Sequence, residues 1–91
     1  MLQLEQNLNR QHAAQCVQLG QAAIARGIAQ FNFSDVTLVD SSAIAIMLAW
    51  QRAANQAQLS LQFIAVPTKL LSLINLYGVA DLFHIESHHH H

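Results

Sequence analysis

The sequence is short of charge and of cysteine, and each shortage excludes a class of protein. Of its 91 residues, 10% are charged and the formal net charge is −1, against about 25% charged residues in an average soluble domain. The four cations are too few and too scattered to follow the phosphates of a nucleic acid; they are Arg10, Arg26, Arg52 and Lys69. The single cysteine, Cys16, excludes an internal disulfide and a multi-cysteine zinc site.

Long apolar runs and targeting signals are also missing. No run reaches the roughly 18 apolar residues of a membrane span, and no basic start followed by an apolar stretch marks a signal peptide. We therefore expect a cytoplasmic protein with one domain over residues 1–87, and we interpret residues 88–91 as part of a purification tag. The chain is rich in apolar residues, at 53%, and in glutamine. This composition is typical of a protein that lies against a partner.

Strand-like and helix-like patterns alternate along the chain. Apolar residues alternate at 2–5, 29–33 and 59–66, which predicts strands, with shorter extended segments at 36–39 and 82–85. Helical spacing predicts helices over 11–26, 43–57 and 67–77, and Gly27 and Gly78 stand where a helix-terminating glycine belongs. The expected fold class is α/β, a sandwich in which helices pack on a mixed sheet of about four strands.

Signatures of catalysis are absent from the sequence. It has no glycine-rich phosphate loop and no G-x-S-x-G elbow. His12 and His84 are not spaced as metal ligands, so we expect no metal, no cofactor and no catalytic residue. Cys16 falls on the apolar face of the first helix, where burial is expected. Trp50 and Tyr77 follow helical spacing, which is compatible either with core packing or with an interface.

Asp40, Ser41 and Ser42 lie between an apolar extended segment and an apolar helix. One interpretation is simple capping, because their side-chain oxygens can accept from the first backbone N–H groups of the helix. The other is a docking or phosphorylation site. The helix dipole tolerates a phosphate at this position, but nearly two added negative charges would repel an apolar partner.

Two segments of the chain resemble STAS domains. The stretch 33–45, FSDVTLVDSSAIA, resembles the family signature, in which a D-S/T-S/A-G-L/I segment joins a strand to the second helix. The stretch 73–83, LINLYGVADLF, is similar to the family as well, and the resemblance extends over residues 2–86. Within the family, the chain looks most like the small cytoplasmic STAS subunits of Mla-type phospholipid ABC transporters. The resemblance implies the STAS α/β sandwich.

The resemblance also implies a function without catalysis. Such subunits bind the ATPase subunit of the transporter, which maintains outer-membrane lipid asymmetry, and they reach the inner membrane through this partner. The implied contact comprises Asp40, Ser41, Ser42, Ala43 and Ile44. The alternative within the family is an anti-sigma factor antagonist. In such a protein, a serine kinase phosphorylates the residue that corresponds to Ser41, and the anti-sigma factor is then released.

The sequence departs from the family in two ways. Ala43 stands where the family usually has glycine, and its methyl group is expected to obstruct a partner that packs close to the backbone. One predicted strand, rather than two, precedes the first helix. An uncovered sheet edge is therefore expected, and such an edge favours pairing with another chain, including a homodimer.

Overall fold

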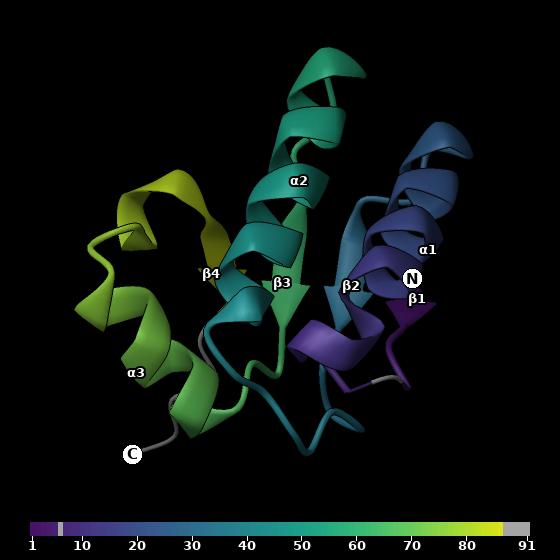
Figure 1. The fold of residues 1–91 in the computed structure, drawn as a ribbon. Helices are drawn as coiled ribbons and strands as arrows, with labels where there is room; N and C mark the ends of the chain where they lie inside the picture. Colours follow the sequence, from purple (N-terminus) through teal and green to yellow (C-terminus); the bar gives the residue numbers. More distant parts are fainter. Residues whose placement is uncertain (6, 87–91) are drawn as a thin grey trace.

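The computed structural model describes residues 1–5 and 7–86, in which strands and helices alternate (Figure 1). Each strand except the last is followed by a helix that leads to the next strand. In chain order the elements are β1 (Leu2–Gln3), the 3-10 helix η1 (Arg10–His12), α1 (Ala13–Ala25), β2 (Gln30–Asn32), α2 (Ser42–Gln56), β3 (Gln62–Ile64), α3 (Thr68–Leu76), the 3-10 helix η2 (Ala80–Leu82) and β4 (His84–Glu86).

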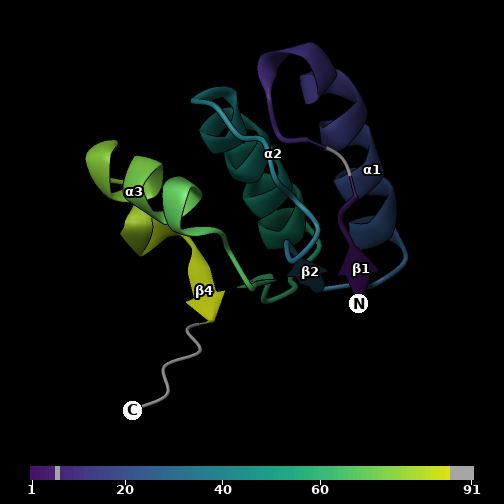
Figure 2. The same ribbon diagram turned by 90° about the horizontal axis from the view of Figure 1, so that it is seen from below.

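The four strands form one sheet in the order β1-β2-β3-β4, and each neighbouring pair is parallel. The predicted α/β class and strand number are confirmed, but the expected mixed sheet is wrong. Each pair of consecutive strands is joined by a helical crossover, which returns the chain in the same direction. Because such crossovers are right-handed and the strand order is sequential, α1, α2 and α3 cover the same side of the sheet (Figure 2).

The two faces of the sheet differ in chemistry. Phe31, Phe63 and Ile85 lie in register on neighbouring strands and pack toward the helices. The next residues along each strand point the opposite way, and the Nε2 of Gln30 donates to the Oε1 of Gln62 there, at 3.3 Å. We call this side the open face. It is mostly neutral and polar, and it carries Gln3, Gln30, Asn32, Gln62, Ile64, His84 and Glu86.

All three α-helices end in the same hydrogen-bonded turn, with one residue in the left-handed region. Gly27 (φ 85°) and Gly78 (φ 69°) occupy this position after α1 and α3, as predicted, and Gln58 (φ 61°) occupies it after α2. The residue that follows donates its N–H to a carbonyl five residues back, which satisfies one of the last carbonyls of the helix. These bonds run from Ile28 to Ala23, from Leu59 to Ala54 and from Val79 to Ile74.

Trp50 is at the centre of the core. It is fully buried, and its Nε1 donates to the carbonyl oxygen of Cys16 in α1 at 2.9 Å. A methyl group on Gly20 would overlap its indole ring, so α1 and α2 cross closely at this point. Trp50 is therefore a core residue, which settles the alternative left open by its spacing. Cys16 is buried as predicted, and burial raises the pKa of its thiol. Trp50 packs edge-on against Phe31 and Phe33 and at a tilt against Phe63.

The predicted strands are shorter or displaced in the structure. The strands expected over 2–5 and 29–33 are limited to β1 and β2, and the segment expected over 82–85 is displaced to β4, because Leu82 lies in η2. The strand expected over 59–66 is limited to β3, because Leu59 donates its N–H to the end of α2 and Ala65 adopts φ 58° directly after Ile64. The extended segment 36–39 forms a single bridge, between Val39 and Leu8. Among the described residues, no helix is both long and apolar enough to cross a membrane.

Candidate functional site

The carboxylate of Asp40 joins the beginnings of two helices. Its Oδ1 accepts from the backbone N–H of Ser42 at 2.8 Å, and its Oδ2 accepts from the backbone N–H of Arg10 at 3.1 Å. The bridge between Leu8 and Val39 brings these two segments side by side. The start of η1, which leads into α1, is therefore fastened to the start of α2.

These contacts stabilise the ionised form of the Asp40 carboxyl. The N–H of Arg10 makes the largest contribution to lowering the pKa of the carboxyl, and the N–H of Ser42 and the Arg10 guanidinium lower the pKa further. A negative charge is thereby held at the N-terminal end of α2, where the helix dipole favours it.

Ser41 occupies the N-cap position of α2 without capping the helix through its side chain. The residue is exposed, and its hydroxyl makes no cap hydrogen bond, while its carbonyl oxygen accepts from the N–H of Ile44 at 3.1 Å. The two interpretations of the motif thus fall on different residues. The carboxylate of Asp40 caps α2, and Ser41 is exposed to solvent.

The last two residues of the predicted contact set lie inside the protein. Ala43 is completely buried and Ile44 is 5% exposed, because a rotation of about 100° per residue carries them to the inner side of α2. Their predicted place at an interface is corrected accordingly, since their side chains support the site from beneath. The expectation that the Ala43 methyl group obstructs a partner is wrong for the same reason.

An exposed stripe continues from Ser41 along α2. Ala45 and Arg52 are exposed and Leu48 is half-buried, and their spacing from Ser41 of four, seven and eleven residues places all four on one side of the helix. We call Ser41, Ala45, Leu48 and Arg52 the outer α2 face. Leu38, which is 58% exposed, lies just before the helix. Sequence reasoning missed Leu38 because the apolar segment 36–39 does not reveal which side chains face outward. Val36 and Val39 are buried, whereas Thr37 and Leu38 are exposed.

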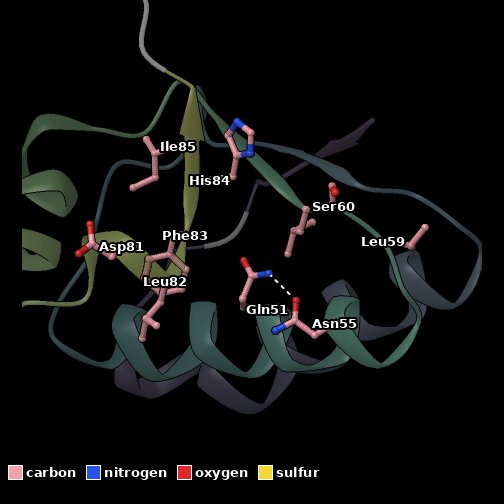
Figure 3. A pocket seen from close by; sticks show the side chains of 10 residues that line it. Gln51, Asn55, Leu59, Ser60, Asp81, Leu82, Phe83, His84 and Ile85 are labelled. Atoms are coloured by element: carbon pink, nitrogen blue, oxygen red, sulfur yellow. Dashed lines mark hydrogen bonds between the residues drawn. The ribbon is translucent and has the colours of Figure 1, made fainter.

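A hollow lies beside the C-terminal half of α2, between this helix, η2 and the first residues of β4 (Figure 3). Gln51 points from α2 into the hollow, and its Nε2 donates to the Oδ1 of Asn55 at 3.0 Å. The Oε1 of Gln51 is buried, and no hydrogen-bond partner for it is found among the described residues. Leu82 borders the hollow and is 56% exposed. Tyr77, predicted as an interface residue, is 52% exposed at the end of α3, and its role stays a prediction.

The histidines lie in unrelated surroundings. The ring Nδ1 of His12 is 2.9 Å from the Oδ1 of Asn9, at the start of η1, whereas His84 is exposed on the open face. In residues 1–5 and 7–86, no group of three His, Cys, Asp or Glu side chains is placed to hold a metal ion.

The family model described as "Mlab, STAS domain" matches residues 1–85. This chain belongs to the STAS-domain family. The resemblance inferred from the two sequence segments is thereby confirmed, and the STAS fold accounts for the sequential strands and the helices on one side of the sheet. No curated protein matches the chain.

Three solved structures share the fold of this STAS domain. A putative anti-sigma factor antagonist from Thermotoga maritima is 14% identical, with a TM-score of 0.76 over 92% of this chain and 74% of that one. The anti-sigma factor antagonist SpoIIAA in its unphosphorylated form is 16% identical, with a TM-score of 0.64 over 96% of this chain and 77% of that one. The phosphorylated Bacillus cell fate determinant SpoIIAA is 15% identical, with a TM-score of 0.62 over 93% of this chain and 79% of that one. At these identities the likeness establishes the fold alone.

Proposed function

We propose that this STAS domain is a non-catalytic subunit that binds the ATPase subunit of a phospholipid ABC transporter. The observation that carries the proposal is the match of residues 1–85 to the family model described as "Mlab, STAS domain". In this proposal the ATPase holds the chain at the inner membrane, and the transporter maintains outer-membrane lipid asymmetry. The contact is formed by Asp40, Ser41 and Ser42 together with the rest of the outer α2 face and Leu38.

The chemistry of this surface supports a protein partner. Leu38, Ala45 and Leu48 supply apolar groups, Ser41 supplies an exposed hydroxyl, and Asp40 and Arg52 supply one charge at each end. Interfaces commonly have a charge-poor centre and a polar rim. Complete burial of a leucine contributes about 2 kcal/mol, and Leu38 still exposes 58% of its surface. Its burial in a complex therefore contributes about 1 kcal/mol.

The proposed contact depends on the neutrality of Ser41. Asp40 already places one carboxylate at the end of α2. A second negative charge on the adjacent residue would have to be desolvated against the partner, which is costly without a matching cation. The fold itself should tolerate the charge, because Ser41 is exposed and its hydroxyl makes no cap bond.

Isothermal titration of the full chain with the ATPase subunit from the same organism tests the proposal. We expect Ser41→Asp to weaken binding by about tenfold or more, a change of about 1.4 kcal/mol, with an unchanged melting temperature. Ser72→Asp is the matched control, because Ser72 is exposed on α3, away from the outer α2 face. The absence of a complex with the wild-type chain, or equal affinity for the Ser41→Asp variant, would contradict the proposal.

A second candidate function is an anti-sigma factor antagonist switched by phosphorylation of Ser41. The exposed hydroxyl of Ser41 favours this alternative, because a kinase needs such a group. Affinity capture from the native cell, combined with mass spectrometry of the peptide that contains Ser41, distinguishes the two functions. Recovery of a serine kinase and a sigma-factor regulator without an ATPase would replace our first proposal, whereas recovery of the ATPase with unmodified Ser41 would support it.

A further inference from the structure

The strand β4 lies at one edge of the sheet and pairs only with β3 among the described residues (Figure 2). An edge strand presents unpaired backbone groups, and proteins usually protect it with proline, lysine or a very short strand. The opposite edge, β1, has two residues. β4 has three residues, His84–Glu86, the same length as the inner strands β2 and β3, with neither proline nor lysine among them.

The side chains of β4 alternate between the two faces of the sheet. Ile85 is in register with Phe63 and packs against the core, so it points toward the helices. His84 and Glu86 are both exposed and lie on the open face. His84 and Glu86 therefore stand two residues apart on the same side of an edge that pairs with no further strand among the described residues.

A second copy of β4 is complementary to this arrangement. If two β4 strands pair antiparallel around Ile85, His84 of one copy lies opposite Glu86 of the other, and the pair occurs twice. Side chains directly opposite each other in an antiparallel pair have Cβ atoms about 5 Å apart, so each histidine meets a carboxylate. Ile85 of each copy meets its own equivalent on the side of the helices.

We propose that two copies of this chain associate through β4, antiparallel and centred on Ile85, so that their sheets become one continuous sheet. The two-fold axis is perpendicular to the sheet, so both open faces lie on the same side. Moving the register by two residues in either direction would place His84 opposite His84, or Glu86 opposite Glu86, and lose both complementary pairs. With only three residues on each side, the interface is small, so the association is weak and depends on concentration.

Sedimentation velocity of the full chain, without any ATPase, tests this proposal separately from the function proposed above. Over protein concentrations of about 10 µM to 1 mM we expect a reversible monomer–dimer equilibrium, because the interface is small. His84→Glu places carboxylates opposite each other twice, and like charges in opposing positions destabilise a sheet. We expect this variant to raise the dimer dissociation constant by about tenfold.

The double variant, His84→Glu with Glu86→Lys, places opposite charges against each other in the same register. We expect it to dimerise at least as well as the wild-type chain, whereas Gln3→Glu on the β1 edge leaves dimerisation unchanged. Circular dichroism checks that each variant is folded, and a chain that ends at Ser87 is run in parallel to remove the influence of the terminal histidines. A monomer at every concentration would overturn the proposal. So would His84→Glu without effect, failure of the double variant to restore the dimer, or loss of the dimer when the terminal histidines are removed.

Discussion

The two flanks of α2 are packed in different ways. On the flank that meets α1, the indole of Trp50 fills the space above Gly20 and donates its only N–H to the carbonyl of Cys16. On the flank that meets η2, Gln51 keeps a buried Oε1 for which the described residues provide no partner, and Leu82 is more than half exposed. We call the side of α2 that meets α1 the closed flank, and the side that meets η2, which contains a hollow (Figure 3), the open flank.

This difference indicates how the candidate site is held. Ser41 lies at the end of α2 where Asp40 ties the helix to Arg10, next to α1, so its position depends on the closed flank. The open flank lies beside the second half of the helix and contributes no contact to Ser41. Disturbance of the α1 contact should therefore affect both folding and the position of Ser41. Changes at Gln51 should leave Ser41 in place, although Leu48 and Arg52 of the outer α2 face border the same side of the helix as Gln51.

The largest effect is expected from Gly20→Ala, which attacks the closed flank directly. The added methyl group would overlap the indole of Trp50, and overpacking together with displacement of a buried ring should cost about 3 kcal/mol of unfolding free energy. Urea titration measures the loss. Gln21→Ala is the control on the next, exposed position of α1 and should change stability by less than about 0.5 kcal/mol. Equal stability of the two variants would show that the helices do not approach as closely as described.

Trp50→Leu should have the next largest effect, with a loss of about 2 kcal/mol from the smaller side chain and the missing hydrogen bond. It also makes room above Gly20. In this background Gly20→Ala should be nearly neutral, and a double-mutant cycle from urea titrations would give a coupling of about 3 kcal/mol. Additive losses would contradict direct packing of the two residues.

On the open flank, Gln51→Met should leave the stability unchanged or raise it by about 1 kcal/mol, because it removes a buried acceptor for which the described residues provide no partner. Thermal unfolding gives the sign, and Asn55→Ala controls for loss of the Asn55 amide that Gln51 contacts. A clear destabilisation by Gln51→Met would show that the Oε1 is satisfied in solution, and would remove the contrast between the flanks.

Gln58→Gly tests the end of α2 that lies beside the same hollow. A left-handed conformation costs a residue with a side chain about 1–2 kcal/mol, whereas glycine gives back roughly half of this through the flexibility of the unfolded chain. We expect a gain of about 0.5 kcal/mol. The control Gln56→Gly, within the last turn of α2, should lower the melting temperature instead.

The smallest effect is expected from pH, through Asp40. Because the folded chain lowers the pKa of this carboxyl below its ordinary value of 3.8, the stability that it contributes is complete above that value. It is lost as the pH falls through the lower, folded pKa. Asp40→Asn can preserve only one of the two acceptor contacts. Urea titrations should show the wild-type chain as the more stable at pH 7, with a difference that shrinks below pH 4. A difference that is independent of pH would contradict this assignment.

Local patterns in the sequence predicted much of the fold, because the determining contacts are close in the chain. Cys16, Gly20 and Ile24 lie on the buried face of α1 as their spacing requires, and both glycine terminators were found. The end of the strand at Ile64 was not found, since it depends on the left-handed conformation of Ala65, a residue that rarely adopts it.

The candidate site was predicted as a segment but not residue by residue. Whether Asp40 or Ser41 caps α2 depends on the N–H of Arg10, thirty residues earlier, which only the pairing of Leu8 with Val39 brings into range. The inward direction of Ala43 follows from where the helix begins, and a shift of one residue at that boundary changes which side chains are exposed. No pattern in the sequence predicts that the Oε1 of Gln51 is buried without a hydrogen-bond partner among the described residues.

The sequential order of the strands has a consequence for how the chain folds. Each strand pairs only with the strand before it and the strand after it, so every pairing in the sheet closes one loop of a single βα unit. Each pairing must wait until the intervening helix has been made, and β4 comes last because it follows the other strands in the sequence. Closing such long loops to pair parallel strands slows folding.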